Sequence, residues 1–253
     1  MSFEISITAL RSIPIVAAGD SLDLLIGDAL SRELELNDGD VVVVSQKIIS
    51  KAEGRTVSLS SISPDDRSRE LARKTGKDAK IVQLIIGESS EILRATENVI
   101  ISIHRTGHTM ANAGVDASNV AGDDDTVLLW PENPDRSAER IRLSLEKRFG
   151  VRLAVIVNDS FGRPWRVGVT GAAIGVSGMS AVLDQRGETD MFGRPLRVTI
   201  SAVADQIATA ALLVLGEAGE GTPVAIVRGA RFSPDDGKGG LSLLRPASED
   251  LFR

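Results

Sequence analysis

Residues 151–160 read VRLAVIVNDS. The first seven are mostly apolar, which predicts a buried strand over residues 151–157. Residues 136–149 just before them have the apolar spacing of a helix, and Gly150 follows where such a helix would end. A helix that leads directly into a buried strand is typical of α/β proteins, whose ligands often bind beyond the strand ends. The polar residues after the strand are therefore candidate ligand-binding residues: Asn158, Asp159 and Ser160.

Other segments carry similar local signals. The pattern predicts helices over residues 20–34, 63–76 and 78–94, with Asp20 or Ser21 capping the first and Ser63 and Pro64 starting the second. It predicts strands over residues 3–7, 41–44, 99–103 and 223–227, and a strand followed by an Ala-rich helix over 196–215. Residues 160–200 lack a clear crossover helix, so a simple doubly wound parallel sheet is not favoured. The fold class expected is mixed α/β.

Composition excludes several classes of protein. The chain has 253 residues and is 42% hydrophobic, which is enough for a substantial core. Its net charge of −6 and its 3% aromatic content argue against a nucleic-acid partner. There is no Cys, which excludes disulfides, thiolate metal sites and a thiol nucleophile. Without an apparent signal peptide or a long apolar run, we expect a cytoplasmic protein with no membrane span.

Three acidic segments stand among small residues: residues 112–119 (NAGVDASN), 158–163 (NDSFGR) and 216–221 (GEAGEG). Glycine-rich turns let backbone N–H groups approach a ligand closely. Carboxylate oxygens suit Mg²⁺ or Mn²⁺, which commonly bridge carboxylates to phosphate oxygens. The alternative for Asp116 is a turn in which the carboxylate bonds its own backbone. For Asp159 and Ser160 the alternative is an ordinary turn at a strand end.

Basic residues accompany these carboxylates. Arg163 and Arg166 follow Asp159 closely, and guanidinium groups pair well with phosphate oxygens. Glu217 and Glu220 follow the Ala-rich helix, where the helix dipole disfavours a carboxylate unless a cation offsets it. Residues 45–55 (SQKIISKAEGR) lack the glycines of a P-loop, although a lysine there could neutralise a phosphate. A solvated basic face explains that segment equally well.

The two histidines, His104 and His108, are four residues apart. Gly107 interrupts the segment, and a strand is predicted beside it, so a shared helical face is not expected. We therefore expect a solvated or hydrogen-bonded pair rather than a metal site. A histidine-centred mechanism is correspondingly disfavoured.

Together these segments resemble one family, the coenzyme F420-0:L-glutamate ligases, also called γ-glutamyl ligases. The resemblance covers about residues 10–227 and is carried by residues 49–55 (ISKAEGR) and by the three acidic segments. It implies a single ligase domain over residues 1–253, in a distinctive α/β fold that forms an intertwined homodimer. The implied reaction joins L-glutamate to coenzyme F420-0 and extends a γ-linked tail through an acyl phosphate. GTP is the implied co-substrate, with Mg²⁺ or Mn²⁺ at two sites and a possible response to K⁺.

The resemblance also implies roles for particular residues. Metal ligands would be Asp116, Asp159 and Ser160, with Glu217 at a second metal. Contacts with GTP would come from Ser12, Ile13, Pro14, Ile15, Ser45, Gln46, Lys51, Asn119, Leu215, Gly216, Glu217, Ala218, Gly219, Glu220, Gly221 and Thr222. Lys51, Arg163 and Arg166 would stabilise the transferred phosphate, and Asp116 and Asp159 complete the expected catalytic set.

The sequence departs from the family at two places. Ser160 stands where many relatives have Thr, and both residues carry a hydroxyl. Gln46 and Lys47 replace small polar residues, and no nitroreductase-like domain of the kind fused in some relatives is expected. Two other functions fit the same residues: a metal-dependent phosphotransferase or hydrolase, and a non-catalytic nucleotide- or deazaflavin-binding protein.

Overall fold

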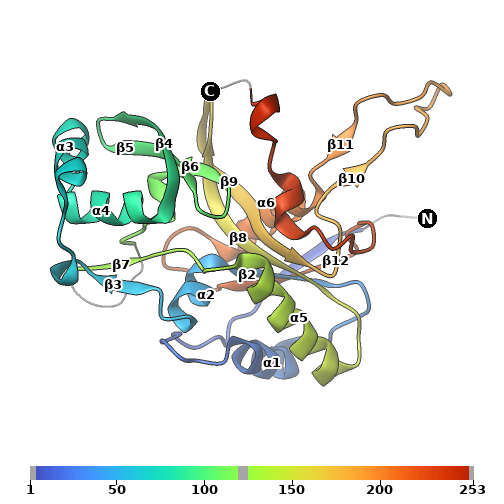
Figure 1. Ribbon diagram of the computed structural model, residues 1–253. Helices are drawn as coiled ribbons and strands as arrows, with labels where there is room; N and C mark the ends of the chain where they lie inside the picture. Colours follow the sequence, from blue (N-terminus) through green and yellow to red (C-terminus); the bar gives the residue numbers. More distant parts are fainter. Residues whose placement is uncertain (1–3, 119–124, 251–253) are drawn as a thin grey trace.

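The computed structural model describes residues 4–118 and 125–250, which are built around a mixed five-stranded sheet (Figure 1). Its order is β1 (Ser6–Ala9), β12 (Val224–Arg228), β2 (Val41–Ser45), β8 (Ala154–Arg163) and β9 (Arg166–Ser177). Within this sheet, β2 and β8 run parallel, and the other neighbouring strands run antiparallel. The expected mixed α/β fold is therefore confirmed.

Helices cover both faces of this sheet. α1 (Leu22–Glu33), α2 (Gln46–Ala52) and α5 (Pro134–Phe149) pack on one face, and α6 (Val203–Leu215) packs on the other. Because successive strand residues point to opposite faces, Val42 and Val44 join the first core while Val41 and Val43 join the second. All four valines are fully buried, as the sequence predicts.

The helix boundaries on this sheet follow from local capping. The side chain of Asn133 accepts a hydrogen bond from the backbone N–H of Arg136, and Pro134 occupies the first turn of α5. Gly150 ends α5 in the left-handed conformation, with φ at 71°. The predicted helix over 136–149 is therefore confirmed, with two further residues at its start, Pro134 and Asp135. α1 follows Ser21, one of its two expected caps.

A smaller sheet of β4 (Ser89–Thr96), β5 (Val99–His104) and β6 (Thr109–Ala111) lies to one side. α3 (Asp66–Thr75) and α4 (Ala79–Glu88) pack against it around a core of their own. The pair β3 (Thr56–Ser58) and β7 (Thr126–Leu128) joins the two parts. Short 3₁₀ turns occupy Leu59–Ser61, Asn112–Gly114, Gly239–Leu243 and Ala247–Glu249.

Two sequence predictions are wrong in this smaller part. The helix predicted over 78–94 ends at Glu88, and the residues that follow form β4, whose Ile92 pairs with Ser102 of β5. The preceding helix begins at Asp66 rather than beside Pro64, because the carboxylate of Asp65 accepts the backbone N–H of Ser68 at 2.7 Å. Ser63 is therefore not the cap.

The long hairpin of β8 and β9 also differs from expectation. The strand predicted over 151–157 begins at Ala154 and continues to Arg163, so Asp159 and Ser160 lie within it and not beyond its end. No helix is described between residues 160 and 200, in agreement with the sequence reading. Those residues include the arm, residues 183–201, which β10 (Leu183–Asp184) and β11 (Ile200–Ser201) close at its base. The arm projects from the body (Figure 1).

Within the described parts of the chain, no helix is both long and apolar enough to cross a membrane.

Candidate active site

A cavity of about 530 Å³ opens where β2 ends, α2 begins and α6 ends. Its volume is ordinary for a small-molecule site. The lining comes from segments far apart in the sequence, and it includes most of the residues implicated by the sequence. These are Ile13, Pro14, Ile15, Ser45, Gln46, Lys51, Asp159, Ser160, Leu215, Gly216, Glu217, Ala218, Gly219, Glu220, Gly221 and Thr222.

Five expected residues are not among the lining residues, and one of them is Asp116, which follows the turn after β6. Ser12 does not line the cavity, because its backbone N–H and hydroxyl both bond the carboxylate of Glu33. Arg163 and Arg166 pair with each other at the exposed tip of the β8–β9 hairpin, away from the cavity of their own chain. Asn119 is not among the described residues.

Asp116 follows an unusual turn. Asn112, Ala113 and Gly114 all have positive φ, which non-glycine residues rarely adopt. The turn delivers Asp116 to a backbone bridge with Leu128. Its carboxylate accepts hydrogen bonds from the backbone N–H and the hydroxyl of Ser118. It also forms an ion pair with Lys47, at 2.8 Å. Burial opposes ionisation of Asp116, but these donors outweigh it and lower its pKa.

Asp159 is in the opposite electrostatic situation. Burial is the main cause that raises its pKa to about 6, and the negative charge of Asp116 adds to the shift. Hydrogen bonds from the backbone N–H of Ser160 and from Trp130 partly compensate. The two carboxylates are therefore electrostatically coupled.

Trp130 fixes the position of Asp159. It is fully buried, and its indole N–H donates to Asp159 Oδ2 at 2.8 Å. Phe161 stacks on one side of the indole, with ring centroids 5.8 Å apart. Gly114 lies against the indole so closely that an added Cβ would be 2.5 Å from Nε1. Sequence reasoning missed this role, because a single Trp in a strand-like segment gives no sign of its partner.

The histidines form a buried hydrogen-bonded pair behind Trp130. Both ring Nδ1 atoms lie within hydrogen-bond distance of the Thr106 hydroxyl, at 2.8 and 2.9 Å. The ring centroids of His104 and His108 are 5.0 and 5.3 Å from that of Trp130. Burial lowers the pKa of His108 to about 4, which keeps its imidazole neutral. The expected hydrogen-bonded pair is confirmed, and the pair supports the packing of Trp130.

The acidic turn after α6 supplies another carboxylate. Ser160 Oγ donates to Glu217 Oε2 at 2.9 Å, which links the long hairpin to this turn. Glu220 folds back instead, and its carboxylate accepts the backbone N–H of Ala218 at 2.8 Å. Gly216 permits this fold, because a Cβ there would lie 2.2 Å from the Glu220 carboxyl carbon. Glu217 is thus directed to Ser160, while Glu220 shapes the turn.

Two lysines of α2 line the same cavity. Lys47 and Lys51 are one helical turn apart, and burial followed by the charge of Lys47 lowers the pKa of Lys51. Asn158 also lines the cavity, and its side-chain oxygen is buried without a hydrogen-bond partner in the described structure. Asn158 was among the candidate ligand-binding residues expected from the sequence, whereas Lys47 was not singled out as an individual site residue.

The oxygen donors fit a hard divalent cation. Asp116, Asp159 and Glu217 offer carboxylates, and Ser160 offers a hydroxyl, which are the ligand types that Mg²⁺ and Mn²⁺ prefer. The unsatisfied oxygen of Asn158 and the raised pKa of Asp159 both indicate a place short of positive charge. Across residues 4–118 and 125–250, no three acidic or histidine side chains already form a metal-binding cluster. The carboxylates are held separately, by Lys47 and by Ser160.

A mixed α/β fold whose cavity combines two lysines, a glycine-rich turn and acidic side chains is suited to an enzyme that binds a charged small-molecule substrate. Comparison with known proteins gives the family. The model for F420-0:gamma-glutamyl ligase matches residues 11–229, and the chain belongs to that family. The resemblance seen in the sequence, and the ligase of coenzyme F420 biosynthesis expected from it, are thereby confirmed.

Three relatives illustrate the similarity. The coenzyme F420:L-glutamate ligase of Methanothermobacter thermautotrophicus is 45% identical over 251 residues, covering 98% of this chain and 99% of the relative. That of Methanocaldococcus jannaschii is 45% identical over 241 residues, covering 95% and 94%. That of Archaeoglobus fulgidus is 39% identical over 251 residues, covering 99% and 97%.

Proposed function

We propose that this enzyme joins L-glutamate to coenzyme F420-0 and extends the product through γ-linkages, using GTP and a divalent metal. Family membership supports the substrates. The observation that carries the proposal is the single cavity that gathers the lysines of α2, the Asp159–Ser160 pair and the Glu217 turn. Phosphate transfer needs positioning and charge neutralisation more than a protein nucleophile, and the chain has no Cys.

In this proposal the side chains divide the work. Asp116, Asp159, Ser160 and Glu217 hold Mg²⁺ or Mn²⁺, which would act as a Lewis acid on phosphate oxygens. Lys51 faces the phosphates, and the 215–222 turn offers backbone N–H groups close to the nucleotide. The terminal carboxylate of the F420-0 tail attacks the γ-phosphate, giving an acyl phosphate and GDP. The amine of glutamate then displaces phosphate, loses a proton and forms the amide.

Mass spectrometry tests this function directly. The reaction contains the protein, F420-0, L-glutamate, GTP and Mn²⁺, and we expect product masses that rise in steps of one glutamyl unit. Omission of metal or GTP abolishes the product, and replacement of K⁺ by Na⁺ tests the potassium response. The matched variant is Asp116→Asn, which keeps the shape of the side chain and should lose most turnover.

Two other outcomes would contradict the proposal. GDP accumulation with an unchanged deazaflavin mass would indicate a phosphotransferase or hydrolase. Binding of nucleotide or deazaflavin without any turnover would indicate a non-catalytic binding protein. Parallel assays with ATP establish whether GTP is the preferred nucleotide.

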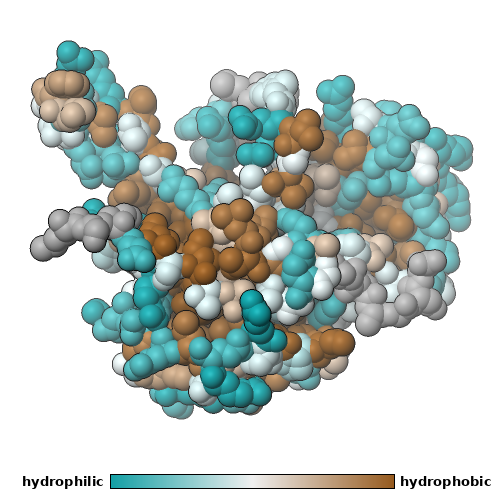
Figure 2. All heavy atoms as spheres, turned by 180° about the vertical axis from the view of Figure 1, so that it is seen from behind, coloured by the Kyte–Doolittle hydropathy of each residue, from teal (hydrophilic) through white to brown (hydrophobic). Residues whose placement is uncertain are grey.

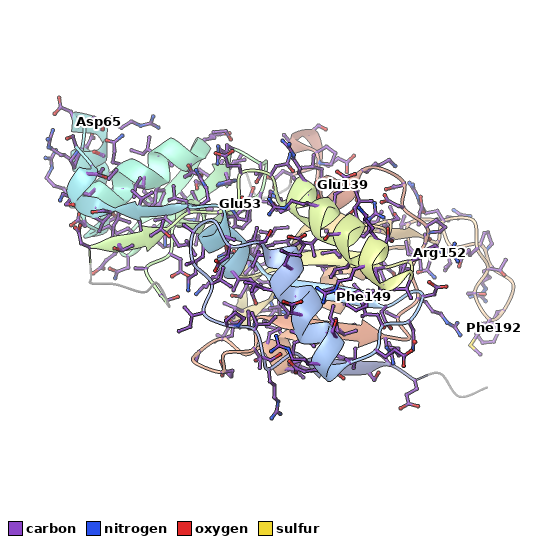
Figure 3. The ribbon with its side chains drawn as sticks, turned by 90° about the horizontal axis from the view of Figure 1, so that it is seen from below. Glu53, Asp65, Glu139, Phe149, Arg152 and Phe192 are labelled. Atoms are coloured by element: carbon purple, nitrogen blue, oxygen red, sulfur yellow. The ribbon has the colours of Figure 1, made fainter. Side chains whose placement is uncertain are left out.

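We also propose that the enzyme is an intertwined homodimer, with the arm packed on a second copy. Met191 and Phe192 are 90% and 75% exposed, and Phe192 lies at the outer end of the arm (Figure 3). Figure 2 shows further hydrophobic side chains exposed on the body of the molecule. Exposed apolar surface of this kind commonly marks a protein interface.

Sedimentation velocity tests the dimer. The double variant Met191→Asp, Phe192→Asp should sediment as a monomer, because burying two carboxylates in an apolar contact is unfavourable. Leu24→Asp on α1 is the matched control, since Leu24 is also exposed but lies outside the arm. A wild-type protein that is monomeric at micromolar concentration would refute the proposal.

A further inference from the structure

Lys47 holds the carboxylate that a metal would need. It is the second residue of α2, it lines the cavity, and its Nζ lies 2.8 Å from Asp116 Oδ2. The same Nζ donates to Ser118 Oγ at 2.6 Å. Asp116 is a candidate metal ligand, but in this structure the cation that pairs with its carboxylate is the ammonium group of Lys47.

The partners of Asp116 are not equally replaceable. The backbone N–H of Ser118 bonds Oδ1 at 2.7 Å, and the Ser118 hydroxyl bonds Oδ2 at 3.0 Å. Both belong to the turn that carries Asp116, so they stay with it and keep the carboxylate oriented. Lys47 reaches from another element, on a flexible chain, and the side chains of this ion pair are 28% and 33% exposed. Partly exposed ion pairs contribute little net free energy, so this contact is the one that exchanges readily.

A displaced Lys47 ammonium has a second site to occupy. Lys51 lines the same cavity one helical turn away, so two cations face the same space. The repulsion between them is relieved when a polyanion, such as the phosphate chain of a nucleotide, enters that space. An ammonium group is a compact point charge that suits phosphate oxygens as well as a carboxylate.

We propose that Lys47 and the divalent metal are alternative counter-ions of Asp116, and that Lys47, once displaced, pairs with a phosphate of the bound nucleotide. The inference rests on the proposed function for the identity of the polyanion. It assigns Lys47 two opposite effects: the ammonium competes with the metal when no nucleotide is present, and it strengthens nucleotide binding when the metal is in place. Metal and nucleotide therefore bind cooperatively.

Mn²⁺ binding to the protein alone tests the first half. Free Mn²⁺ is measured by electron paramagnetic resonance during titration of wild type, Lys47→Met and Lys47→Arg. We expect Lys47→Met to bind Mn²⁺ three- to tenfold more tightly, because the competing charge is gone, while Lys47→Arg stays near wild type. In an Asp116→Asn background the same Lys47→Met change should have no effect, because there is no shared carboxylate. Equal or weaker Mn²⁺ binding by Lys47→Met would overturn the inference.

Binding of a non-hydrolysable GTP analogue with Mn²⁺ tests the second half. Lys47→Met should lose tenfold or more in affinity for the analogue and at least as much in glutamate-dependent turnover. Lys74→Met, in the last turn of α3, controls for loss of a surface charge and should match wild type. Tighter Mn²⁺ binding with unchanged analogue affinity would refute transfer of the ammonium to phosphate.

Failure of this inference and failure of the proposed function are distinguishable. Wild-type protein without glutamate-dependent turnover refutes the function, whereas the Mn²⁺ titrations use neither nucleotide nor deazaflavin. Circular dichroism and thermal unfolding confirm that each variant is folded before binding is compared.

Discussion

The indole N–H of Trp130 donates a 2.8 Å hydrogen bond to Oδ2 of Asp159, so a fully buried ring orients a carboxylate at the edge of the cavity. The backbone N–H of Ser160 holds the other oxygen at 2.8 Å. Together they restrict the carboxylate to one orientation. Groups that orient a metal ligand in this way commonly affect metal affinity almost as strongly as the ligand itself.

Trp130→Phe should weaken Mn²⁺ binding by about tenfold, because Phe preserves the stacking on Phe161 but removes the donor. It should also cost about 1–3 kcal/mol of unfolding free energy, since a buried acceptor loses its partner. Equilibrium dialysis with Mn²⁺ and urea unfolding measure the two effects. Trp165→Phe, at the exposed hairpin tip, is the control for loss of a Trp. Mn²⁺ affinity unchanged in Trp130→Phe would show that the hydrogen bond has no orienting role.

Asp159→Asn should stabilise the metal-free protein at neutral pH. Burial raises the pKa of Asp159 from 3.8 to about 6, so the folded state binds a proton more readily than the unfolded state. The contribution of Asp159 to the free energy of unfolding therefore decreases as the pH rises from 3.8 to about 6. Asn cannot ionise, so the stability difference between variant and wild type should be small near pH 4 and reach its full size above about pH 6. Urea unfolding at several pH values without metal gives this difference, and a difference independent of pH would argue against a buried, ionising Asp159.

Gly114→Ala should displace Trp130 and thereby weaken Mn²⁺ binding. The φ of Gly114 is 67°, and the new Cβ would lie 2.5 Å from Trp130 Nε1. Gly76→Ala provides the matched control, because Gly76 has φ of 71° but no atom near the position of its Cβ. Both variants carry about 1 kcal/mol of backbone strain, and only Gly114→Ala adds the collision. Mn²⁺ titration and near-ultraviolet circular dichroism should therefore change in Gly114→Ala alone.

Glu88→Gln should destabilise the smaller sheet by about 3 kcal/mol, because it leaves the largely buried Arg55 with only the exposed Glu132, 3.7 Å away, as a counter-ion. The Glu88 carboxylate is 2.8 Å from Arg55 and 3.2 Å from Arg105. Burial opposes its ionisation, but the hydrogen bond with His104 and the charge of Arg55 lower its pKa to about 2. This contribution is present above pH 4.5 and is lost as the pH falls toward 2. Urea unfolding at several acidic pH values should show that the difference in unfolding free energy between variant and wild type decreases over that range. A difference that does not change with pH would contradict a stabilising ionised Glu88.

Elements with local signals were predictable from the sequence. Val41–Val44 form a continuous apolar run, and the helix ending at Phe149 has a cap, a proline and a terminating glycine in order. β4 was not predictable, because Ile92 and its neighbours continue a helical pattern. Pairing with β5, formed by residues later in the chain, decides that they are a strand.

The glycines of β9 show a second limit of prediction from the sequence. Gly171 and Gly175 lie where the backbone of Ala208 and of Pro134 would meet a Cβ at 2.5 and 2.4 Å. The sequence suggested tight packing over 168–180, but only the fold reveals that α6 and α5 approach the strand there.

The cavity residues were predictable where polar side chains stand in distinctive sequence motifs. Asp159, Ser160 and Glu217, which the family resemblance implies as metal ligands, line one cavity, and their role as ligands stays a prediction. Lys47 and Trp130 were missed because their roles come from contacts with residues distant in sequence: Lys47 reaches Asp116, and Trp130 reaches Asp159. Arg163 and Arg166, plausible by proximity in sequence, are carried away from the cavity by the extension of β8.

Asp116 and Asp159 belong to different parts of the molecule. Asp116 follows Val115, which packs in the core of the smaller sheet, whereas Asp159 lies on a strand of the large sheet. A cation held by both would cross-link two separately packed cores. With the cation bound, the two cores would then unfold together in one cooperative transition. A cation required for catalysis would in this way also stabilise the fold.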